Sequence, residues 1–105
     1  MNDITGEKPW VLLVEDEHLV RMMGVLMFSD AGFHVMEARS ADEGWEFLCG
    51  GGPAHLLFTD IHVPGLLNGL ALANLVYRRW PHIPILVVSG RASPDSQQLL
   101  SLIHI

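Results

Sequence analysis

Four acidic or hydroxyl residues in this sequence each follow a short apolar run, and together they could form one chemical site. Asp60 ends one run, Glu15 and Asp16 follow another, and Ser89 follows a third. Three carboxylates brought together repel one another, by about 4 kcal/mol for a pair ~4 Å apart at an effective dielectric constant of about 20. Mg²⁺ offsets such repulsion, because one or two carboxylates suffice to bind it and positions remain for water and phosphate oxygens. Asp60 could then carry a phosphoryl group beside Mg²⁺, with the Ser89 hydroxyl as a donor to it.

The apolar runs predict the strands that would bring these residues together. Unbroken apolar runs bounded by turn residues indicate strands that are buried on both faces, as in a parallel sheet. We expect strands over residues 10–14, 34–38, 56–60 and 85–88. In a parallel sheet the carboxyl ends of the strands share one edge, where ligands bind. The four residues should therefore meet at that edge.

Helical spacing and cap residues predict the connections between the strands. Ser40 and Glu43 have the spacing of a capping box, and Asn68 can cap a later helix. We expect helices over residues 18–31, 43–49, 68–80 and from about 93 to 100. The order βαβαβαβα predicts an α/β fold with a doubly wound parallel sheet and right-handed crossovers.

The first of these helices has its apolar residues at helical spacing, which favours a core-facing side. The apolar residues at this spacing are Leu19, Met22, Met23, Leu26 and Met27, and we expect Met22, Met23 and Met27 to fill the core.

Composition sets the class of protein. The chain has 105 residues, half of them hydrophobic, and a formal charge of −6. We expect an N-terminal tail over residues 1–9 and one domain over residues 10–105. The acidic balance argues against nucleic acid as a direct partner, which would need a cluster of basic residues. A lone cysteine, no signal peptide and no apolar run near the ~20 residues of a membrane span favour a cytoplasmic protein without a membrane partner.

The chain resembles the receiver domains of two-component response regulators. Three motifs carry the resemblance: Val11–Glu17, then Asp60–Gly65 with Asn68 and Gly69 beyond it, then Val87–Gly90. The resemblance implies a flavodoxin-like sheet in the order 2-1-3-4-5. It also implies a signalling module and not an enzyme, with a histidine kinase or a phosphotransfer protein as partner.

The same resemblance assigns roles to residues. Asp60 would be the phosphoacceptor, and Glu15 and Asp16 would be the acidic pair at the Mg²⁺. The backbone carbonyl of His62 would add a third protein oxygen to the metal. Ser89 would be the switch hydroxyl that turns toward the phosphoryl group.

Two features depart from the family pattern. The nine positions from Asp60 to Gly69 are one more than is common, as in some stand-alone receivers. In addition, a fifth strand with a Lys-Pro pair and a fifth helix are missing: the single lysine is Lys8, and the sequence ends at Ile105. We therefore expect the sheet order 2-1-3-4, with the fifth strand absent or supplied in trans, and a weakened switch. The apolar face of the helix over residues 18–31 would then be uncovered. Uncovered apolar surface and an exposed fourth-strand edge would favour a homodimer or a domain swap.

Two other functions remain open at this point. The chain could be a pseudo-receiver, an interaction or dimerisation module in which phosphorylation is not productive. It could also be a phosphatase with an aspartate nucleophile. Such phosphatases need a second acid two residues after the nucleophile, and this position is His62 here.

Overall fold

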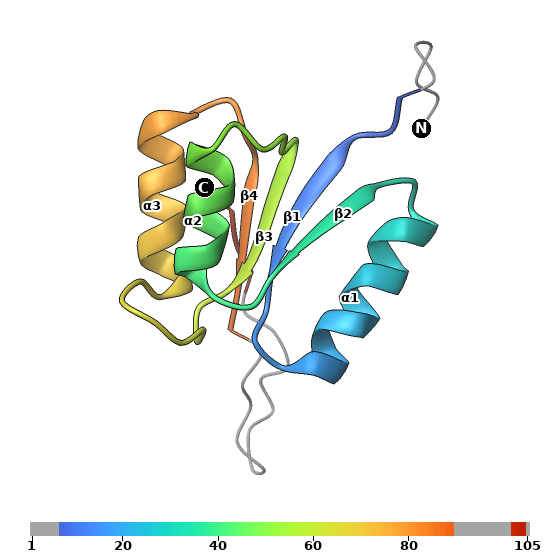
Figure 1. Cartoon of the computed structure of the whole chain (residues 1–105), viewed down its shortest axis with the longest axis horizontal. Coiled ribbons are helices and arrows are strands. Elements are labelled where there is room, and N and C mark those ends of the chain that lie inside the picture. The colour runs from blue at the N-terminus through green and yellow to red at the C-terminus, as the bar shows by residue number, and fades with distance from the viewer. Residues whose placement is uncertain (1–6, 90–101, 105) are drawn as a thin grey trace.

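The computed structural model describes residues 7–89 and 102–104, and its strands and helices alternate along most of the chain (Figure 1). The strands are β1 (Trp10–Val14), β2 (His34–Ala38), β3 (Leu56–Asp60), β4 (Ile85–Val88) and β5 (Leu102–His104). The helices are α1 (His18–Asp30), α2 (Ala41–Cys49) and α3 (Gly69–Arg79). The bounds predicted for β1 to β4 and α1 to α3 are confirmed to within two residues. The helix expected from about 93 to 100 lies outside the described residues.

The strands form one sheet in the order β2-β1-β3-β4-β5. β1 pairs with β2 and β3, and β3 pairs with β4, all in parallel, so the predicted order 2-1-3-4 is confirmed. The register places Val14 opposite Thr59 and Asp60 opposite Val88. The residues that follow β1 and β4 therefore flank the end of β3.

The fifth strand corrects one expectation. Residues Leu86 to Val88 of β4 pair in antiparallel orientation with β5, so this edge of the sheet is covered and not exposed. Unpaired N–H and C=O groups at a sheet edge favour pairing with any extended segment. A run as short as Leu102–His104 carries too weak a sequence signal to predict such a strand. The family pattern, by contrast, has a parallel fifth strand.

Helices cover both faces of the sheet, and alternate strand residues point to opposite faces. α2 and α3 lie side by side on one face, and α1 lies on the other, over β1 and β2 (Figure 1). Leu12 and Leu57 belong to the core cluster under α2 and α3, whereas Val11 and Leu13 pack with Phe28 of α1. Burial on both faces explains the unbroken apolar runs in the sequence.

The outer side of α1 corrects another expectation. The buried residues of α1 are Arg21 and Phe28. The apolar residues at helical spacing are between 47% and 71% exposed: Leu19, Met22, Met23, Leu26 and Met27. Their spacing identified an apolar face correctly but could not say whether anything covers it, and no described element of the chain does. The expectation that Met22, Met23 and Met27 fill the core is therefore wrong, whereas the expectation of an uncovered apolar face on this helix is confirmed.

Cap residues define the starts of α2 and α3, as predicted. The Ser40 hydroxyl accepts a hydrogen bond from the Glu43 backbone N–H at 3.1 Å, and the Asn68 side chain accepts one from Ala71 at 2.8 Å. Both caps satisfy backbone donors that the first helical turn leaves unpaired. In the parts of the chain that the structure describes, no helix combines the length and hydrophobicity needed to span a bilayer.

Candidate functional site

Asp60 lies at the carboxyl end of β3, where the sheet and the following loop hold it from several sides. It is 6% exposed. Its Oδ1 atom accepts a hydrogen bond from the His62 backbone N–H at 2.9 Å, and its carbonyl oxygen accepts one from Thr59 Oγ1 at 3.0 Å. A Cβ atom at Gly69 would collide with that carbonyl oxygen, so only glycine fits there. These contacts fix the direction of the Asp60 side chain.

Glu15 and Asp16 follow β1 in the loop that leads to α1. Glu15 is 7% exposed, and its backbone N–H continues the β1–β2 ladder by donating to Ala38 O at 3.0 Å. Its Oε2 atom accepts a hydrogen bond from the Glu17 backbone N–H at 3.0 Å. The Oδ1 atom of Asp16 is also buried. The loop therefore keeps the Glu15 carboxylate and one oxygen of the half-buried Asp16 away from bulk water.

The environment of Glu15 raises the pKa of its carboxyl from 4.5 to about 7. Burial is the largest cause, and the negative charges of Asp60 and Asp16 add to it, as does a side-chain hydrogen bond with Asp60. The Glu17 N–H bond acts in the opposite direction. Two carboxyl groups can share a hydrogen bond only when one of them is protonated. The raised pKa of Glu15 therefore marks a place where a cation would relieve the repulsion among these carboxylates.

The two remaining predicted residues lie at the same edge of the sheet. Ser89 is half-buried and directly follows Val88, the residue opposite Asp60 in the sheet register. His62 is exposed and contacts Asp60 through its backbone N–H. The structure thus brings all the residues predicted for the site to one end of the sheet.

The donor set fits Mg²⁺ better than a metal that needs a closed cage. Among the described residues, no three carboxylate, imidazole or thiol groups converge as metal ligands. The expected cluster of three carboxylates is therefore a close pair, Glu15 and Asp60, with Asp16 next to it in the chain. Mg²⁺ binds through one or two carboxylates and keeps several waters, so a pair of carboxylates is a donor set of the kind that Mg²⁺ uses.

Residues 11–102 match the family model of the response regulator receiver domain. The chain belongs to this family. Its members are signalling modules of two-component systems, in which phosphorylation and Mg²⁺ binding are typical. They interact with histidine kinases or phosphotransfer proteins.

In similar proteins, the region that resembles this chain is one part of a longer chain. This chain is 36% identical to the sensor kinase CckA of Brucella abortus over 91 residues, which are 86% of this chain and 9% of CckA. It is 30% identical to the nitrogen assimilation regulatory protein NtrX of Azorhizobium caulinodans over 87 residues, or 82% of this chain and 19% of NtrX. The receiver therefore spans less than a fifth of either relative.

Solved receiver structures have the same fold. A response regulator receiver protein from Sinorhizobium medicae superposes with a TM-score of 0.77 at 28% identity, covering 86% of this chain and 79% of its own. The receiver domain of NtrX from Brucella abortus gives a TM-score of 0.66 at 31% identity, covering 73% and 64%.

The sequence did not reveal the residue that secures the loop after Asp60. Asp42, in the first turn of α2, accepts hydrogen bonds from the backbone N–H groups of Leu66 at 2.9 Å and Leu67 at 3.1 Å. Gly65 beside it has φ +114°, a conformation that favours glycine. The extra residue between Asp60 and Gly69 is thus held by a carboxylate 18 positions before Asp60 in the chain, which no local pattern predicts.

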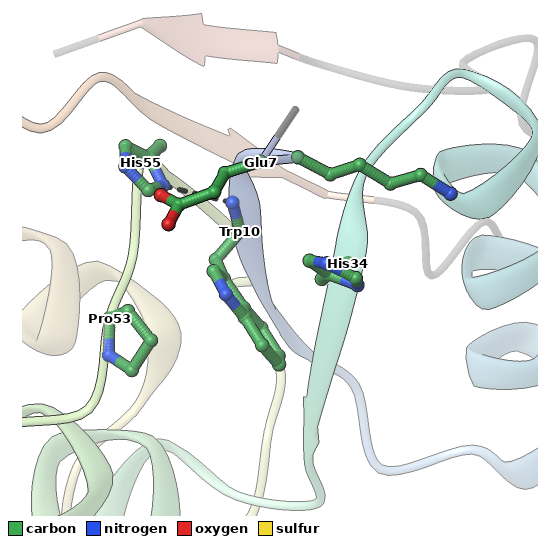
Figure 2. A pocket seen from close by; sticks show the side chains of 6 residues that line it. Glu7, Trp10, His34, Pro53 and His55 are labelled. Carbon is green, nitrogen blue, oxygen red and sulfur yellow. Dashed lines mark hydrogen bonds between the residues drawn. The ribbon is translucent and has the colours of Figure 1, made fainter. Parts of the chain in front are cut away.

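Apart from the acidic site, a hollow lies at the opposite end of the sheet, at the amino ends of the strands. Figure 2 shows Trp10, His34, His55, Pro53 and Glu7 around it. The rings of Trp10 and His34 lie 4.8 Å apart, and the Trp10 backbone N–H donates to His55 Nδ1 at 2.9 Å. These contacts account for two histidines that the sequence left without a role, and the strand length separates them from Asp60.

Proposed function

We propose that this receiver accepts a phosphoryl group on Asp60 from a histidine kinase or a phosphotransfer protein in the cytoplasm, and then changes the surface that it presents to a partner. The observation that carries the proposal is the buried Asp60 carboxyl beside Glu15, whose pKa is raised by burial first and then by the neighbouring charges of Asp60 and Asp16. This crowding of acids favours a divalent cation at the same place.

The transfer has a simple balance. An oxygen of the Asp60 carboxylate attacks the phosphorus of a phosphohistidine, so that a P–O bond forms as the P–N bond breaks. The imidazole leaves with the electron pair and takes up a proton. The products of the transfer are an acyl phosphate on Asp60 and a neutral histidine on the donor. His62 N–H, which donates to Oδ1 of Asp60, orients the carboxylate for this attack.

In this proposal Glu15, Asp16, Asp60 and the backbone carbonyl of His62 would hold Mg²⁺, which neutralises charge on the transferring phosphoryl oxygens. Ser89 would donate its hydroxyl to the phosphoryl group, because it follows the β4 residue opposite Asp60. The single lysine, Lys8, precedes β1 at the other end of the sheet.

The test is to incubate the protein with acetyl phosphate and Mg²⁺ and to measure its intact mass. We expect a gain of one phosphoryl group that requires Mg²⁺ and is absent in Asp60→Ala. Glu46→Gln, at an exposed acid of α2, should retain the gain. A folded wild-type protein with no mass gain would contradict the proposal and favour the pseudo-receiver.

We also propose that a second copy of the chain covers the outer face of α1. This face is formed by Leu19, Val20, Met22, Met23, Leu26 and Met27, each 46% to 71% exposed. The charged residue within this stretch, Arg21, is buried, so two such faces can approach although each chain carries a charge of −6. The fold, moreover, covers the β4 edge through which we first expected a dimer to form.

The exposed surface is large enough for such a dimer. The exposed fractions of the six residues add up to about three and a half fully exposed residues in each copy. If two copies buried them completely, the hydrophobic contribution to the free energy of association would be roughly 10–20 kcal/mol. Association itself costs about 4–15 kcal/mol. Sedimentation at increasing concentration should show a dimer that Met23→Glu converts to monomer and Tyr77→Glu, at an exposed residue of α3, does not. A wild-type protein that stays monomeric over about a 100-fold range of concentration, up to its solubility limit, would contradict this proposal.

A further inference from the structure

Arg21 is the one charged residue of α1 that is buried, at 7% exposed, although the same helix exposes its leucines and methionines. Hydrophobic burial cannot account for this arrangement, because a guanidinium loses far more hydration than a methionine side chain on entering the protein. The place of Arg21 must therefore be set by its polar contacts.

Those contacts converge on the acidic loop. Nη1 of Arg21 donates to the backbone carbonyl of Glu15 at 3.0 Å and lies 3.4 Å from the carbonyl of Asp16. Nε donates to Oε1 of Glu37 on β2 at 3.1 Å, and Nη2 is 3.3 Å from Nδ1 of His18. The planar guanidinium holds its donors in a rigid fork that fixes several acceptors in set directions, whereas the three donors of an ammonium rotate.

We infer that Arg21 is a positioning residue for the metal site: it holds the peptide groups of Glu15 and Asp16 so that their side chains face Asp60. The inference rests on the proposed function, because it assigns Arg21 a role in Mg²⁺ binding. A carbonyl held by Arg21 cannot rotate, and the direction in which each side chain leaves the backbone is fixed with it. Glu37 in turn fixes Arg21, and ties the loop to β2.

A purely structural role predicts a different outcome. Arg21 also connects α1 to β2, so its loss could destabilise the domain without any specific effect on the loop. Val25, in the same helix, packs with the core cluster on that face. Val25→Ala is therefore a matched control that loosens α1 and leaves the loop contacts in place.

The experiment follows Mg²⁺ titrations by the backbone amide resonances of residues 14–17 and 59–62. We expect Arg21→Gln to weaken Mg²⁺ binding at least about tenfold, as is usual when a residue that orients metal ligands is lost. Arg21→Lys should also weaken it. Glu37→Gln, which keeps an acceptor for Nε, and Val25→Ala should bind like the wild type. In the metal-free protein, hydrogen exchange at the Glu17 amide, which donates to Glu15 Oε2, should accelerate in both Arg21 variants and not in Val25→Ala.

Two outcomes would overturn the inference: Mg²⁺ affinity of the Arg21 variants within twofold of the wild type, or an equal loss in Val25→Ala. If Arg21→Gln does not fold, Arg21→Lys is judged by the same criterion. Failure of the proposed function gives a different result, because the wild-type protein itself would then show no Mg²⁺-dependent shifts.

Discussion

The substitution Glu15→Gln should change how the stability of the metal-free protein depends on pH. In the unfolded chain the Glu15 carboxyl ionises near its ordinary pKa of 4.5, whereas in the fold its pKa is about 7. The protonated form is therefore favoured in the fold. Its contribution to the free energy of unfolding is complete below pH 4.5 and is lost as the pH rises through 7. Since one pKa unit corresponds to 1.36 kcal/mol, the loss amounts to about 3 kcal/mol.

Glutamine has no charge to bury, so Glu15→Gln should unfold with nearly the same free energy at pH 5 and pH 8. At pH 8 it should be more stable than the wild type by about 2–3 kcal/mol, because it avoids the buried, crowded charge. Urea unfolding in EDTA, followed by circular dichroism at intervals between pH 5 and 8, measures the difference. Glu46→Gln, at an exposed residue of α2, is the control and should follow the wild type. Parallel pH profiles for wild type and Glu15→Gln would refute the reasoning.

Other predictions concern the metal and the loop after β3. Mg²⁺ must displace the proton that the Glu15 carboxyl binds with a pKa of about 7, so its affinity should rise with pH up to about 7 and then level off. Calorimetry in two buffers should detect the released proton, and an affinity that is constant from about pH 5.5 to 8 would contradict this. Asp42→Ala removes two backbone hydrogen bonds and should accelerate hydrogen exchange at Leu66 and Leu67, at a cost of about 1–3 kcal/mol in stability. Unchanged exchange there would show that Asp42 does not hold the loop. Gly69→Ala places a methyl group against the Asp60 carbonyl and should destabilise the domain by about 1–3 kcal/mol and slow phosphorylation, as measured by urea unfolding and by rates with acetyl phosphate. Wild-type stability in this variant would mean that α3 shifts freely.

The sequence predicted most of the fold because its signals are local. The runs that form β1, β3 and β4 are apolar without alternation, since each strand is buried on both faces. Ser40 and Asn68 mark the starts of α2 and α3 because a cap acts on backbone N–H groups within one helical turn. The same logic located the site, because parallel strands bring their carboxyl ends to one edge.

Features that depend on contacts distant in the sequence were not predictable in this way. The apolar side of α1 is exposed because no described element packs on it, and spacing within a helix carries no information about what lies opposite. Arg21 interrupts that apolar pattern, which was a signal, but its partners on β2 and in the β1–α1 loop come only from the fold. β5 is three residues long, and its antiparallel pairing depends on the open edge of β4.

The central claim is that a carboxyl oxygen of Asp60 carries the phosphoryl group. The most direct measurement treats the protein with acetyl phosphate and Mg²⁺, reduces it with borohydride, and sequences its peptides by mass spectrometry. Borohydride reduces an acyl phosphate to an alcohol, so residue 60 should be found as homoserine in the wild type, and only when Mg²⁺ was present. Homoserine at Asp16 or another acid, or phosphate retained on a serine or histidine after reduction, would contradict the account.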